Sequence, residues 1–244
     1  MIDTAELAPP RVALGTIDLL LRDRAVMLAR IRNGNVGPIL RTMVATIAIA
    51  MGIVGAALGS YRGDQQILYA AIKLPLVLLG TAALSAPVLT TLGMALGRRA
   101  RLASDLALVM TALAYGALLL CACTPLIMLG RALDLGYHQM ILATVTMFAI
   151  AGGMALRMIV QAVSHERERG WLAAVLGLCT VFVLVGGQLS WALRPYLVRP
   201  RAQDIPFIRE VEGSLFDSIV TATRSARGVY TREEAPLPAW ELSR

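Results

Sequence analysis

Five long apolar stretches, separated by short charged loops, set the pattern of hydrophobic and polar positions along the chain. They cover residues 42–60, 68–97, 106–130, 140–158 and 171–193. Most have about 20 residues or more, the length needed to cross a roughly 30 Å hydrocarbon layer. Runs this long that do not alternate favour helices over a barrel, because every backbone group in lipid needs a partner within the protein. The pattern predicts an all-α polytopic membrane helix bundle with about five transmembrane helices.

Two less apolar flanks surround the predicted transmembrane domain, which we place at residues 42–195. In the N-terminal segment, residues 1–41, apolar positions recur near the 3.6 period between 12 and 32 and predict an amphipathic helix on the inner leaflet. A cytoplasmic helix packed on the bundle is the alternative. The C-terminal segment, residues 196–244, predicts an ordered extracytoplasmic tail with a short amphipathic helix at about 213–227.

Composition agrees with a membrane protein and excludes some other classes. The chain is 57% hydrophobic and 16% charged, against about 25% charged in a soluble domain. The net charge of +7 would also fit a nucleic-acid binder, but the basic residues flank the apolar stretches and form no stripe with aromatics, so we expect no nucleic-acid partner.

The three cysteines, Cys121, Cys123 and Cys179, lie in predicted spans without an accompanying His or acid. We expect no metal and no cofactor.

The distribution of arginines predicts the orientation of the chain. With a cytoplasmic N-terminus, the cytoplasmic segments carry twelve arginines and the short outer loops only Arg62 and Arg131, as the positive-inside rule requires. Five spans then place the tail, which from Arg194 onward holds eight arginines and seven acids, in the periplasm of a bacterial inner membrane. The alternative has one re-entrant span and both ends in the cytoplasm. The first apolar run begins too late for a cleavable signal peptide.

The second predicted span holds the main candidate functional residue. Lys73 is the only lysine in the chain, and Pro75 and Pro87 predict kinks in the same helix. A charge at membrane depth is costly and often functional. The alternative is a lysine whose stem snorkels to the outer interface or pairs with Asp64 or Asp134.

Four further polar residues and five glycines are candidates for a polar site and for helix packing. We predict that His138, Gln188, Trp191 and Arg194 contribute polar or interfacial groups near the outer leaflet, although a lone His at an interface is commonly a polar anchor. The glycines of two GxxxG patterns favour close helix packing within the bundle, with an oligomer contact as the alternative. These glycines are Gly52, Gly55, Gly59, Gly93 and Gly97.

Several short strings of this sequence resemble strings found in a known group of proteins. They are Lys73-Leu74-Pro75, Tyr137-His138, the run from Gly187 to Pro195, Pro206-Phe207 and the run from Glu212 to Ile219. Together they resemble bacterial five-span inner-membrane proteins that are similar in layout to the Yip family. The resemblance covers about residues 67–220 and implies a location for Lys73, Gln188, Trp191 and Arg194 near the outer leaflet. It implies no biochemical role.

No catalytic signature was found in the chain: there is no H-E-x-x-H, G-x-S-x-G, Walker or dinucleotide pattern. We therefore expect a non-enzymatic integral membrane subunit that scaffolds or docks a larger complex through its GxxxG faces and its tail. Its expected partners are the lipid bilayer and other membrane subunits, with a homo-oligomer as a further option. The alternative is a small-solute or ion transporter subunit with a polar site at Lys73. A lipid-modifying enzyme is a weaker third hypothesis, because no nucleophile is evident.

Overall fold

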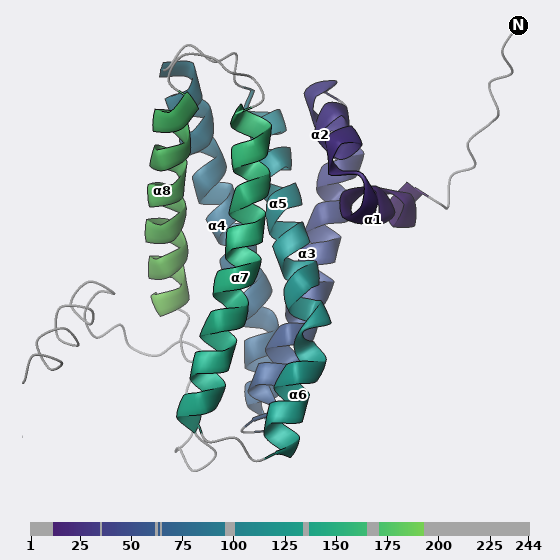
Figure 1. Ribbon diagram of the computed structural model, residues 1–244, viewed down its shortest axis with the longest axis vertical. Helices are drawn as coiled ribbons and strands as arrows, with labels where there is room; N and C mark the ends of the chain where they lie inside the picture. The colour runs from purple at the N-terminus through teal and green to yellow at the C-terminus, as the bar shows by residue number, and fades with distance from the viewer. Residues whose placement is uncertain are drawn as a thin grey trace, which may run out of the picture. The chain divides into compact units, whose positions relative to one another are not determined.

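The computed structural model describes residues 12–34, 36–61, 63, 65–95, 101–133, 137–164 and 171–192, all of them within the first of two compact units, Met1–Arg209. In this part of the chain every regular element is an α-helix (Figure 1). The helices are α1 (Val12–Arg22), α2 (Arg24–Arg32), α3 (Gly37–Gly59), α4 (Gln65–Ala95), α5 (Leu102–Ala122), α6 (Thr124–Ala132), α7 (Tyr137–Ser164) and α8 (Trp171–Ala192).

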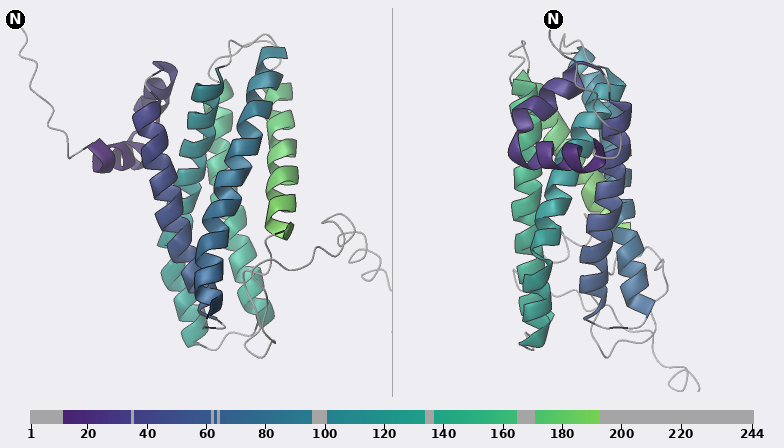
Figure 2. Two further views of the ribbon diagram at one scale, coloured as in Figure 1. Left: turned by 180° about the vertical axis from the view of Figure 1, so that it is seen from behind. Right: turned by 90° about the vertical axis from the view of Figure 1, so that its right-hand side faces the viewer.

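The long helices lie side by side as an up-and-down bundle (Figures 1 and 2). Four helical segments are long and apolar enough to cross a membrane: Gly37–Gly59, Gln65–Ala95, Leu102–Ala132 and Ala143–Val163. In α8 the described apolar stretch is shorter, Val175–Leu184. The predicted all-helical fold is therefore confirmed in the described residues, four of the helical segments are candidate membrane spans, and the fifth crossing stays a prediction.

Helix α5 occupies the centre of the bundle. Of the apolar stretch in Leu102–Ala132, 67% is buried inside the protein, against 22% for the stretch in α7. Helix α5 packs against α3, α4 and α7, and α8 packs on the far side of α4. Helices α7 and α8 consequently present most of their apolar surface outwards, as expected for helices that face lipid.

The central span is interrupted between α5 and α6. Helix α5 ends at Ala122, Cys123 forms the turn, and α6 restarts with Pro125 in its first turn. Proline has no N–H to donate and fits the first turn of a helix, where that donor has no intrahelical partner. The apolar stretch 106–130 is therefore divided into two helices at Cys123.

The N-terminal segment departs from the prediction. A single amphipathic helix over residues 12–32 was expected, but two helices form and meet at Asp23. The Asp23 backbone is extended, at φ −137°, and its Oδ1 accepts a hydrogen bond from the Val26 N–H at 3.1 Å. A carboxylate at this position caps a new helix. Helix α1 lies across the axes of the long helices, whereas α2 runs alongside them (Figure 2).

Candidate functional site

The position of Lys73 is set by a close crossing of α3 and α4. A Cβ placed on Gly55 would lie 2.6 Å from the Ala70 carbonyl carbon and 2.8 Å from the Ala71 Cα, and one on Gly59 would lie 2.7 Å from the Ile67 Cα. Carbon atoms do not approach this closely without a bond, so only glycine permits the observed spacing of the two backbones. The GxxxG pair of α3 is therefore used inside this chain.

Gly52 contributes less to the contact between α3 and α4 than Gly55 and Gly59 do. At Gly52 an added Cβ would lie 3.7 Å from the Ala71 carbonyl oxygen, an ordinary contact distance. Gly93 is buried on α4, and Gly97 lies outside the described residues. The close approach of α3 to α4 thus lies in the first two turns of α4, around Ile67 and Ala70.

Lys73 lies just beyond this crossing and is fully inside the bundle. It is 1% exposed and is the largest of the fully buried side chains among the described residues. Lys73 is the ninth residue of α4, so it lies about 12 Å along the helix axis from Gln65. With its whole side chain buried, the stem does not run along the bundle surface towards an interface. Its two proposed acidic partners, Asp64 and Asp134, lie outside the described residues.

Lys73 belongs to a series of buried polar residues on α4. Of the nine buried polar or charged residues in the described part of the chain, five lie on this helix. They are Gln66, Lys73, Thr81, Ser85 and Thr90. A lipid-facing or purely structural helix has little reason to bury so many polar groups, because each must find a hydrogen bond or remain costly.

Two features of α4 leave buried polar groups with fewer hydrogen bonds than usual, one beside Lys73 and one further along the helix. Pro75 is buried and has no N–H, so the Ala71 carbonyl lacks the bond that an ordinary helix residue would donate. Further along, the Ser85 hydroxyl is buried and has no hydrogen-bond partner among the described residues. By contrast, the Thr81 hydroxyl donates to the Val77 carbonyl at 2.7 Å.

A buried acid at the other end of α4 is a contact that the sequence did not reveal. Asp105, in the first turn of α5, is 1% exposed, and its Oδ2 lies 2.8 Å from the Thr90 hydroxyl. The signal was a single acid at the entry to an apolar span, but its partner on another helix could not be read from spacing alone.

Helix α2 is tied to the centre of the bundle by a second contact that was not foreseen. The Arg24 guanidinium donates a hydrogen bond to the Tyr115 hydroxyl at 2.9 Å and lies 4.4 Å from the centre of the ring. Tyr115 is on α5 and is 4% exposed. The hydrogen bond and the cation–π contact together fix α2 against the central helix.

The remaining predicted polar site residues lie on α7, on α8 and beyond. His138 is the second residue of α7, and Gln188 and Trp191 lie on α8, with their side chains outside the described residues, as is Arg194 altogether. Within the described residues no group of three or more His, Cys, Asp or Glu is arranged to hold a metal ion.

Comparison of the chain with protein-family models, with curated proteins and with solved structures finds no match. The Yip-like layout therefore stays a prediction, and any functional conclusion depends on the site itself.

Proposed function

We propose that the protein is an integral membrane protein that binds and moves a small anionic solute or ion at Lys73. The observation that carries this proposal is the complete burial of the chain's only lysine in a candidate membrane span. An ammonium inside a membrane bundle is costly and typically marks a substrate or ion pathway. A small anion is the ligand whose charge complements it.

The surroundings of Lys73 support a pathway along α4. Gln66 is seven residues earlier and lies on nearly the same face, while Thr81 and Ser85 continue the buried polar series deeper into the span. Proline at 75 and at 87 interrupts the hydrogen bonding of this helix twice, which allows it to bend. A bent helix with buried polar groups is suited to line a route for a solute.

The test is a flux measurement with the purified full chain in liposomes. Uptake of chloride, nitrate and phosphate would be compared for the wild type, Lys73→Met and Lys73→Arg. We expect flux of at least one anion in the wild type, its loss in Lys73→Met and partial retention in Lys73→Arg. Arg131→Gln, on an exposed residue at the end of α6, is the control for a general effect of charge. Equal flux in Lys73→Met and the wild type would contradict the proposal.

The second candidate is a non-enzymatic subunit that scaffolds or docks a larger membrane complex. It is favoured by the outward face of α7, where Gly152 and Gly153 are exposed and a Cβ on either would meet nothing within 4 Å. Small residues on a span allow another helix to approach closely. This candidate predicts that a tagged chain purified in mild detergent brings down membrane proteins in fixed proportion, that deletion of residues 196–244 abolishes this, and that Lys73→Ala does not.

For either function we propose a bacterial inner membrane with the N-terminus in the cytoplasm. Helices α3 and α5 begin and α7 ends at one end of the bundle (Figure 1). The described arginines at this end include Arg30, Arg32, Arg41 and Arg101, whereas α6 carries only Arg131 at the other. This asymmetry supports the orientation because loops rich in arginine stay in the cytoplasm.

A further inference from the structure

An arginine stands on the outer surface of a candidate membrane span. Arg157 lies within Ala143–Val163 and is exposed, and no hydrogen bond or ion pair links it to another described residue. Its own helix presents large apolar side chains outwards nearby, with Ile150 63% and Val145 58% exposed. A guanidinium on such a surface is stable in a bilayer only where it reaches the lipid headgroups.

A second guanidinium lies at the same level of the bundle. Arg24 is held on the Tyr115 ring of α5. The next residue, Gly116, touches α7, because a Cβ placed there would lie 3.4 Å from the Ala155 Cβ. Arg157 follows Ala155 by two residues, about 3 Å along the α7 axis. Arg24 and Arg157 therefore lie within one helical turn of each other in height.

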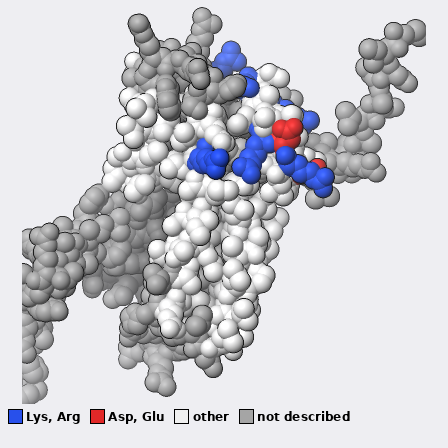
Figure 3. Space-filling model, viewed as in Figure 1, with Lys and Arg blue, Asp and Glu red and all other residues white. Residues whose placement is uncertain are grey.

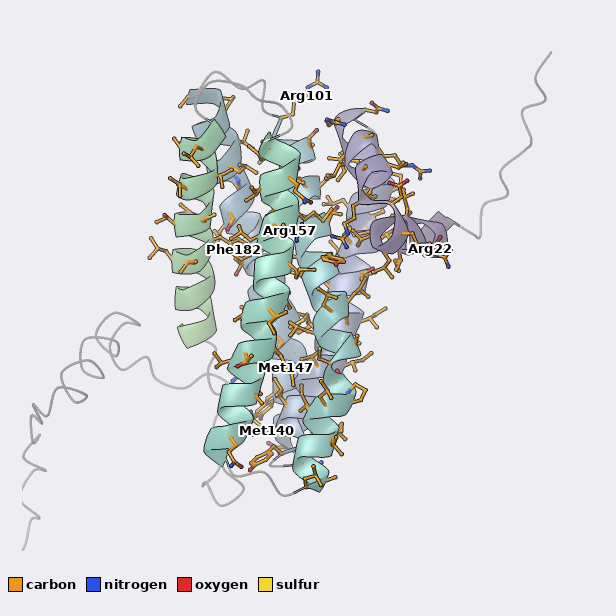
Figure 4. All side chains as sticks on the ribbon, in the orientation of Figure 1. Arg22, Arg101, Met140, Met147, Arg157 and Phe182 are labelled. Atoms are coloured by element: carbon orange, nitrogen blue, oxygen red, sulfur yellow. The ribbon has the colours of Figure 1, made fainter. Side chains whose placement is uncertain are left out.

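A third arginine, Arg22 of α1, lies at the same height along the bundle (Figure 4). Figure 4 shows Arg22 and Arg157 at a similar height, with Arg101 at the end of the bundle beyond them. Figure 3 shows a band of basic side chains across this face, over α7 and α1 and the surface between them. The two acids nearby are already engaged: Asp18 pairs with Arg22 at 2.6 Å, and Asp23 caps α2. Accepting an N–H does not neutralise the Asp23 carboxylate, so these three arginines and two acids together carry a net charge of +1. Arg157 is the arginine of this group that no described acid pairs with or adjoins in sequence.

The distance from this level to the other end of α7 matches a bilayer. From Tyr137 to Arg157 there are twenty residue steps, about 30 Å of helix, which is the thickness of a hydrocarbon core. A headgroup layer at Arg157 therefore places the opposite one at Tyr137, a residue type enriched at that depth. Helix α1, lying across the bundle at the Arg157 level, then runs in the plane of the membrane surface.

We propose that Arg24 and Arg157, with Arg22 of α1, form a binding site for the headgroups of anionic phospholipids in one leaflet of the surrounding bilayer. Guanidinium groups match phosphate in charge and in hydrogen-bond geometry. Arg24 uses one of its five N–H donors on Tyr115, so the contact that fixes α2 leaves other donors available to a phosphate. The proposal requires the chain to be embedded in a membrane and does not depend on transport at Lys73.

The test is native mass spectrometry of the purified full chain in detergent, titrated with phosphatidylglycerol or with phosphatidylcholine. We expect preferential retention of phosphatidylglycerol. Arg157→Gln is expected to weaken this retention about fivefold, since one arginine near an anionic surface contributes on the order of 1 kcal/mol. Arg157→Lys, which keeps the charge, is expected to restore most of it.

The matched control is Arg101→Gln, an exposed arginine at the same end of the bundle but away from the band. It is expected to leave phosphatidylglycerol retention unchanged. Because Arg157 is exposed, its substitution is not expected to lower the thermal unfolding midpoint, and measuring that midpoint separates lost binding from lost folding. Equal retention of the two lipids, or equal losses in Arg157→Gln and Arg101→Gln, would overturn the proposal.

Discussion

At the scale of single residues, glycine sets the distance between helices and polar side chains hold the ends of helices together. Gly55 brings the α3 backbone against Ala70 and Ala71, two residues before Lys73 on α4. The buried Thr90–Asp105 pair joins the last turns of α4 to the first turn of α5. Both contacts fix α4, the helix that carries Lys73, from its two ends.

Gly55→Ala is expected to destabilise the bundle, whereas Gly52→Ala is not. The Gly55 methyl group would collide with backbone atoms that cannot rotate away, and overpacking of this kind costs about 1–3 kcal/mol. At Gly52 the same methyl group meets only an ordinary contact, and alanine favours the helix. Thermal unfolding in detergent measures both variants. Equal midpoints for the two would mean that the helices separate easily at this crossing.

Thr90→Val is expected to lower stability by about 1–3 kcal/mol, because it removes a donor from a buried acid. Thr91→Val is the matched control, since Thr91 is exposed and its hydroxyl donates only to the Val88 carbonyl at 3.1 Å. The free energies of unfolding in a denaturing detergent titration distinguish the two. If both valine variants are as stable as the wild type, the Thr90–Asp105 hydrogen bond does not hold α4 to α5.

At the scale of elements, the sequence predicted helix bounds well where a long apolar run sets them. It predicted poorly where a single polar contact sets a helix end or a helix–helix contact. The predicted second span, 68–97, falls close to α4, Gln65–Ala95, because a long apolar run has few alternatives in a bilayer. The N-terminal helix was predicted without its break at Asp23, because the apolar period continues through that residue. The Arg24–Tyr115 contact spans 91 positions in sequence, and no local pattern reports it. The burial of Lys73 likewise depends on neighbouring residues that cannot be predicted from the sequence of α4.

Tyr115→Phe tests whether one hydroxyl holds α2 on the bundle. The ring and its cation–π contact with Arg24 remain, while the 2.9 Å hydrogen bond is lost, at a cost of about 0.5–1.5 kcal/mol. We expect faster amide hydrogen exchange in α2, with exchange in α3 unchanged. Arg24→Ala removes both contacts and is expected to accelerate exchange further. Unchanged protection in α2 with both variants would show that apolar packing of Met27 and Ile31 is sufficient.

At the scale of the whole molecule, the number of crossings decides where the tail lies. Four helical segments meet the length and apolarity of a span, and four crossings return the chain to its starting side. Helix α8 has 22 residues, about 33 Å at 1.5 Å per residue, which is also enough to cross. It packs on α4, where a Cβ on Gly177 would meet the side chain of Leu92. A helix of that length packed along a candidate span is expected to be a fifth crossing.

A fifth crossing predicts opposite sides for the two ends of the chain. With Cys121, Cys123 and Cys179 replaced by alanine, single cysteines at Leu133 and at Arg101 report the two ends of the bundle, since both residues are exposed. A membrane-impermeant maleimide added to intact cells is expected to label Leu133→Cys and a cysteine after Arg244, but not Arg101→Cys. Labelling of Arg101→Cys in place of Leu133→Cys would reverse the orientation. Labelling of Leu133→Cys without labelling of the cysteine after Arg244 would place the tail in the cytoplasm. Helix α8 would then be re-entrant. The arginines of the tail would in that case follow the positive-inside rule, as those of the rest of the chain do.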